Sequence, residues 1–62
     1  MESNENFIKI INVSGFEQII NKKYIYRIVQ FENKCRITMC YPGMQNDEID
    51  VSNSIDEIYK HL

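Results

Sequence analysis

The sequence predicts a small single-domain α+β protein with the element order β-α-β-β-β-α. Three observations lead to this fold class. Runs of β-branched and aromatic residues alternate with turn signals, two Ser-x-x-Glu patterns are typical of helix starts, and 62 residues are too few for two domains. We expect a three- or four-stranded, mostly antiparallel sheet with two short helices on one face.

The chain begins with a polar stretch and continues into a first strand. Residues 1–6 are polar and acidic, and we expect a disordered tail there, ahead of a single α+β domain over residues 7–62. Residues 7–13 are mostly β-branched or aromatic, which predicts a strand.

A short first helix is predicted over residues 14–21. Ser14 and Glu17 fit the capping box, in which the hydroxyl accepts from the backbone amide three residues on and the carboxylate accepts in return. A helix would place three apolar side chains on one side, so we expect these to be buried: Phe16, Ile19 and Ile20.

A hairpin is predicted in the middle of the chain. Residues 24–31 and 35–41 are β-rich runs joined by residues 32–34. A two-residue turn places the even-numbered residues of the first run on one face with the odd-numbered residues of the second, whereas a three-residue turn uses the opposite face. We favour the two-residue turn, because a longer loop would want glycine where Lys34 stands. Asn33 is the residue best able to adopt a positive φ.

The C-terminal third predicts a turn, a strand and a second helix. Pro42 and Gly43 suit a β-turn, since proline presets φ at its second position and glycine supplies a positive φ at its third. Residues 49–51 predict a short edge strand. Ser54 and Glu57 form another capping box. The helix behind it carries one apolar stripe: Ile55, Ile58, Tyr59 and Leu62.

Composition argues against catalysis and against a membrane protein. Cys35 and Cys40 fall on opposite faces of one predicted strand, ~16 Å apart, and a disulfide needs Cα atoms within ~7 Å. These two thiols and His61 are too few for a structural zinc site, and their spacing gives no reason to expect a catalytic Cys–His pair. We expect no enzymatic activity, no cofactor and no metal. The polar start and the lack of a long apolar run predict a cytoplasmic protein.

Charge is distributed unevenly along the chain. Residues 21–41 carry five basic side chains and one acidic one, whereas residues 42–62 carry five acidic and one basic. Such asymmetry can steer a charged partner or favour association of copies. The residues we expect to bind a partner lie on the basic aromatic hairpin and in the acidic segment after it: Tyr24, Tyr26, Arg27, Arg36, Tyr41, Met44, Asp47, Glu48 and Asp50.

From residue 24 onward the order of elements resembles HicB-type antitoxin domains, in which Pro-Gly follows the second strand and a Glu-bearing helix follows the third. The match covers about two thirds of the chain. The β-β-β-α half is also similar to double-stranded-RNA-binding domains. Those begin the last helix with lysines, whereas this chain has Asp56 and Glu57 there.

These features predict a non-enzymatic binding protein. The residue types are those of A/T-rich codons, which suggests an inhibitor or accessory factor from a phage or mobile element that covers a larger host protein, for example a defence or nucleic-acid-handling enzyme. One alternative is a nucleic-acid or nucleotide binder that uses the basic hairpin. Another is a HicB-like antitoxin or a self-assembling module, since a homodimer would complete so small a core.

Overall fold

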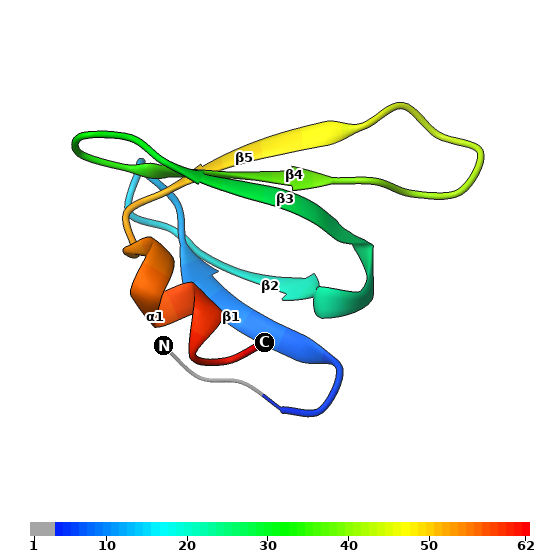
Figure 1. Cartoon of the computed structure of the whole chain (residues 1–62), viewed down its shortest axis with the longest axis horizontal. Helices are drawn as coiled ribbons and strands as arrows, with labels where there is room; N and C mark the ends of the chain where they lie inside the picture. Colours follow the sequence, from blue (N-terminus) through cyan, green and yellow to red (C-terminus); the bar gives the residue numbers. More distant parts are fainter. Residues whose placement is uncertain (1–3) are drawn as a thin grey trace.

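The computed structural model describes residues 4–62 and shows two antiparallel sheets with one short α-helix, so a small, mostly β, α+β fold is confirmed at this coarse level (Figure 1). The predicted single sheet of three or four strands with two helices is wrong, because the five strands of residues 4–62 form two separate sheets. A two-stranded sheet pairs β1 with β2, and a three-stranded sheet has the order β3-β4-β5. The elements in chain order are β1 (Phe7–Ile11), β2 (Glu17–Asn21), the 3-10 turn η1 (Lys22–Tyr24), β3 (Ile25–Gln30), β4 (Cys35–Met39), β5 (Asp47–Val51) and α1 (Ile55–Tyr59).

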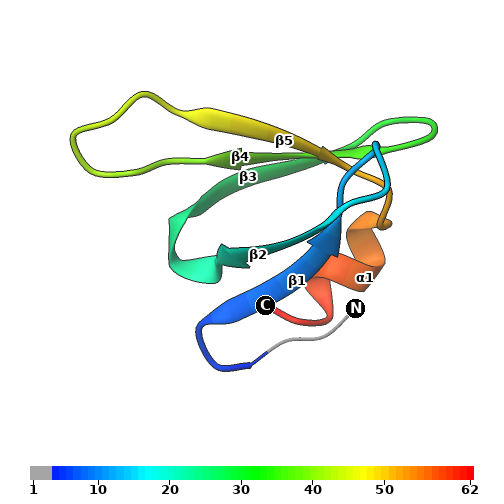
Figure 2. The same ribbon diagram turned by 180° about the vertical axis from the view of Figure 1, so that it is seen from behind.

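The elements form two layers. The three-stranded sheet is one layer, and the β1–β2 ribbon together with α1 covers one of its faces (Figures 1 and 2). Between the layers lies a core drawn from every element except β3 and η1: Ile8, Ile10, Ile20, Cys35, Ile37, Met39, Val51 and Ile58. The alternation of these positions along the strands places one face of each sheet inward.

Two backbone contacts join the sheets where β1 leaves its ribbon. The Ser52 amide donates to the Ile11 carbonyl at 2.9 Å and the Val13 amide donates to the Asp50 carbonyl at 3.1 Å, and together these bonds form a bridge between Asn12 and Val51. The buried Asn53 side chain continues this junction, since its Oδ1 accepts from the Ile11 amide at 2.9 Å and its Nδ2 donates to Glu57 Oε2 at 3.5 Å. Asn53 therefore ties β1 to α1.

The predicted first helix is wrong, because residues 17–21 form β2 and pair with β1. The Asn12 side chain accepts from the amides of Ser14 and Phe16, both at 3.0 Å, and Gly15 adopts a φ of +90°. These contacts make a tight turn that sends the chain back along β1. As a strand, the segment buries Ile20 but leaves Phe16 and Ile19 exposed, contrary to the helical prediction.

The predicted two-residue turn of the central hairpin is confirmed. Gln30 faces Cys35 across the ladder, and the Phe31 amide donates to the Lys34 carbonyl at 2.7 Å. Asn33 does not adopt a positive φ, since none of the non-glycine residues in 4–62 does so. A bulge between Ile25 and Arg27 then shifts the register, so Ile25 rather than the next residue faces Met39.

The C-terminal predictions are largely confirmed. Gly43 adopts a φ of +71°, and the Met44 amide donates to the Tyr41 carbonyl at 3.2 Å, as the Pro-Gly turn requires. The edge strand begins two residues earlier than predicted. Ser54 caps α1 with both halves of the capping box in place. In residues 4–62, no helix is long and apolar enough to cross a membrane.

The predicted helical stripe is only partly buried. Ile58 is fully buried, but Tyr59 and Leu62 are exposed, because α1 is only five residues long and turns a single row toward the core. Of the predicted tail, residues 1–3 lie outside the described residues. Asn4 Oδ1 accepts from the amides of Asn6 and Phe7 at 2.9 and 2.8 Å, so the stretch before β1 carries local hydrogen bonds.

Candidate functional site

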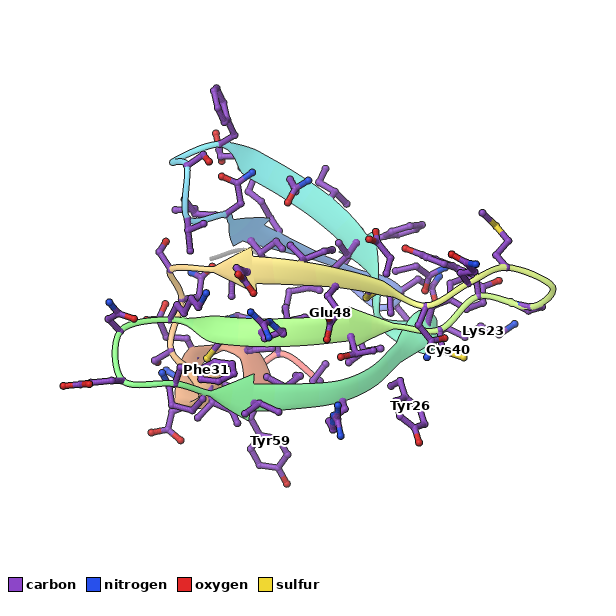
Figure 3. All side chains as sticks on the ribbon, turned by 90° about the horizontal axis from the view of Figure 1, so that it is seen from above. Lys23, Tyr26, Phe31, Cys40, Glu48 and Tyr59 are labelled. Carbon is purple, nitrogen blue, oxygen red and sulfur yellow. The ribbon has the colours of Figure 1, made fainter. Side chains whose placement is uncertain are left out.

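A groove of about 480 Å³ runs between β3 and α1, along the outer edge of the three-stranded sheet. Figure 3 shows that Tyr26 and Tyr59 both project beyond this edge. Apolar side chains predominate in its lining, which consists of Ile25, Tyr26, Arg27, Ile28, Ile55, Asp56, Tyr59 and Leu62.

Local structure explains why large apolar side chains surround the groove. The β-bulge removes Tyr26 from its place opposite β4, and the side chain is 69% exposed. Tyr59 is the last residue of α1 and Leu62 lies beyond its end, and these residues are 75% and 53% exposed. Ile28 and Ile55 are partly buried against the core and form the floor. The groove thus combines a fixed apolar floor with apolar rims that nothing within residues 4–62 covers.

Two opposite charges stand at the rims. Arg27 comes from β3 and Asp56 from the first turn of α1, and both are exposed. Because the two charges lie on different walls, an apolar segment in the groove would meet a cation on one side and an anion on the other.

The outer face of the sheet carries a second cluster. Arg36 and Asp50 are paired across β4 and β5, and Arg36 Nε donates to Asp50 Oδ1 at 2.9 Å. Lys34 Nζ donates to Asp50 Oδ2 at 2.8 Å. The ring of Phe31 lies 5.1 Å from the Arg36 guanidinium and 5.8 Å from Lys34 Nζ. The register therefore joins residues that the sequence had assigned to separate basic and acidic surfaces.

The Asp50 cluster predicts acid sensitivity. Hydrogen bonds from Arg36 and Lys34 lower the pKa of Asp50 from its usual 3.8 to about 2. A carboxyl whose pKa is lowered in the folded state adds stability above its unfolded pKa and loses it as pH falls through the folded value. We expect the urea midpoint of the parent protein to decrease as the pH is lowered from 3.8 to about 2. Asp50→Asn should make this decrease smaller. Equal slopes in the two proteins would contradict the assignment.

The other predicted site residues are scattered. The rings of Tyr24 and Tyr41 meet at 5.3 Å, and both residues are partly buried against the core. Met44 is exposed in the loop after the Pro-Gly turn, and Asp47 and Glu48 are exposed on β5. Only Tyr26 and Arg27 of the predicted set line the groove.

Sequence reasoning missed the helical half of the groove. The sequence predicts only that Ile55, Tyr59 and Leu62 share one apolar stripe of a helix. Their spacing was the available signal, but it marks an apolar face without saying whether that face is covered.

The thiols and the acidic groups were also candidates for chemistry. Cys35 is buried, and its Sγ donates to Gln30 Oε1 at 3.1 Å, whereas Cys40 is exposed; both are free. Burial, and then the charge of Glu57, raise the pKa of the Cys35 thiol, which is the opposite of what a nucleophilic cysteine needs. Within residues 4–62, the structure shows no group of three or more His, Cys, Asp or Glu that could hold a metal ion.

Comparison with protein-family models, with curated proteins and with solved structures finds no match for this chain. The groove, the paired charges and the strand edges are therefore the features on which a function can be proposed.

Proposed function

We propose that this chain is a small non-enzymatic binding protein that covers a site on a larger protein, holding an apolar segment of that partner in the groove between β3 and α1. One observation carries the proposal: Tyr26, Tyr59 and Leu62 converge on one concavity from two elements, and each is more than half exposed. Single exposed apolar residues are ordinary, but a group around one groove is typical of an interaction site.

The groove also indicates the chemistry of the partner. Tyrosine is enriched at the energetic centres of protein interfaces, where its ring fills a pocket and its hydroxyl remains hydrated. Arg27 and Asp56 favour a segment whose apolar residues are flanked by an acidic group on one side and a basic group on the other. The predominance of residue types with A/T-rich codons supports an inhibitor or accessory factor from a phage or mobile element, which acts on a host protein in the cytoplasm.

The charge pattern favours a protein partner over nucleic acid. Arg36 and Lys34 are both paired with Asp50, so two of the cations of the predicted basic hairpin lie beside a carboxylate that offsets one of their two charges. Nucleic-acid affinity comes mainly from cations that reach phosphates and is strongest at low salt. We therefore expect no oligonucleotide gel shift at low salt, and a salt-sensitive shift would favour the alternative.

Site-specific crosslinking tests the groove. We would place the photoreactive residue p-benzoylphenylalanine at Tyr59 and, as a control of similar exposure, at Met44, and irradiate each protein in host lysate. Only the Tyr59 position is expected to give a discrete adduct, whose partner is identified by mass spectrometry and purified. With that partner, Tyr59→Ala is expected to weaken binding on the order of tenfold or more, whereas Met44→Ala leaves the affinity unchanged.

Two results would contradict this function. One is an adduct that forms at Met44 but not at Tyr59, which would move the interface to the loop. The other is a purified partner whose affinity does not respond to Tyr59→Ala. Circular dichroism of each variant confirms that the fold is intact in either case.

A further inference from the structure

The outer edges of the two sheets differ in how well they are protected against another strand. β3 has a bulge at Tyr26 and a charge at Arg27, and β5 is acidic along its length. The far edge of β1 is met by Ser52 and Asn53. Bulges, charges and covering segments are the usual devices that prevent edge pairing.

β2 carries none of these devices. Its five residues pair with β1 without a bulge, and Glu17, its only charged residue, is bound by Lys9 Nζ at 3.0 Å. Within residues 4–62, no strand pairs with its other edge. Ile19, a β-branched residue that is 69% exposed, lies at the centre of the strand.

The hydrogen bonds at the two ends of the β1–β2 ribbon show which backbone groups of β2 point away from β1. The Asn12 amide donates to the Phe16 carbonyl, and the Lys22 amide donates to the Asn6 carbonyl, both at 2.9 Å. In an antiparallel pair the direction of these groups alternates, so the even-numbered residues of β2 face β1. The amides and carbonyls of Glu17, Ile19 and Asn21 therefore point away from the ribbon.

We propose that a second copy of this chain pairs antiparallel with β2, joining two ribbons into a four-stranded sheet about a two-fold axis. The axis passes beside Ile19, which then faces the same residue of the other copy, while Glu17 faces Asn21. Each contact is repeated by symmetry, as an isologous interface requires. Paired β-branched residues stabilise such a ladder.

Charge selects the antiparallel direction. Antiparallel pairing brings the acidic start of β2, Glu17, toward the basic continuation of the other copy at Lys22 and Lys23. Parallel pairing would instead place the two glutamates together. Pairing also stabilises the β1–β2 ribbon, because a two-stranded ribbon is only marginally stable in water and a sheet of three or more strands is more stable.

The dimer would be bivalent. Viewed from above, β2 lies on the opposite side of the molecule from the projecting Tyr26 and Tyr59 (Figure 3). Pairing at β2 therefore leaves both grooves open. The dimer does not depend on the proposed function, and the groove variants and the β2 variants test the two separately.

Sedimentation equilibrium and amide exchange test the interface. At high concentration we expect twice the monomer mass of 7.4 kDa. Amide exchange at Glu17, Ile19 and Asn21 should slow as concentration rises, while the outward amide of Ile28 on β3 should not respond. Ile19→Lys sets like charges opposite each other and is expected to weaken the dimer on the order of tenfold. Met44→Lys changes a residue of similar exposure (71% against 69% for Ile19) and should leave the dimer unchanged.

A backbone variant separates the edge from the side chain. A synthetic chain with an N-methyl group on Ile19 loses the outward donor but no bond to β1, so it should stay folded and monomeric. A parent protein that remains at monomer mass at every concentration would overturn the proposal. So would a dimer that tolerates both Ile19 changes, or one whose concentration-dependent protection lies on β3.

Discussion

Met39→Ala is expected to unfold a large share of the protein. Met39 is fully buried on β4, the central strand, and belongs to a core of eight side chains. Truncating a buried methionine to alanine lowers the free energy of unfolding by about 2–5 kcal/mol, partly because a cavity is left behind. A core in a chain of this size rarely supplies more than ~3–5 kcal/mol in all. The free energy of unfolding, measured by urea titration with circular dichroism, should approach zero in the variant.

Met44→Ala is the matched control. The same side chain is removed, but Met44 is 71% exposed in the loop after the Pro-Gly turn. Surface substitutions of this kind usually change stability by no more than ~0.5 kcal/mol. Similar urea midpoints for Met39→Ala and Met44→Ala would mean that β4 does not face the core as described.

The central hairpin shows what the sequence can predict. Its register depends on the length of one turn, and the lack of glycine at Lys34 was enough to favour two residues over three. The alternation of β4 then identified Cys35, Ile37 and Met39 as one face, which is the buried one. Local rules and the final packing agree for the length of the turn and for the buried face of β4.

The segment around Ser14 shows where local rules fail. Its Ser-x-x-Glu pattern has the same form as the one at Ser54, yet only the second caps a helix. In the first, the Asn12 side chain accepts hydrogen bonds from the amides of Ser14 and Phe16, and the returning chain pairs with β1 as a strand. A capping pattern cannot report such a partner, although the β-branched Ile19 and Ile20 favoured a strand.

The groove could not be predicted because it depends on two local irregularities. The bulge that turns Tyr26 outward is not encoded by a glycine or proline, and the shortness of α1 decides that Tyr59 stays exposed. Charge by segment was also misleading. The register joins Arg36 to Asp50, so a surface that is basic in sequence contains a carboxylate in space.

Asn53→Ala is the other substitution expected to have a large effect. Asn53 is buried, and it accepts from the Ile11 amide while donating to Glu57. Alanine would leave that amide without its partner at the junction of β1 and α1. A fully buried donor left unsatisfied costs about 1–3 kcal/mol, and because the bond of the Ile11 amide is part-buried we expect a loss toward the lower end of this range. The same urea titration should show this loss at neutral pH.

Asn53→Asp separates the hydrogen bond from the charge. Aspartate keeps an acceptor for the Ile11 amide but sets a carboxylate against Glu57, whose own pKa is lowered by its bonds to Ser54 and Asn53. Repulsion raises the folded pKa of the new carboxyl, so protonation favours the folded state. Relative to the parent, this variant should therefore be destabilised at neutral pH and recover as pH falls through that raised pKa, whereas Asn53→Ala should show no such recovery. If both variants matched the parent at neutral pH, Asn53 would not be the tie between sheet and helix.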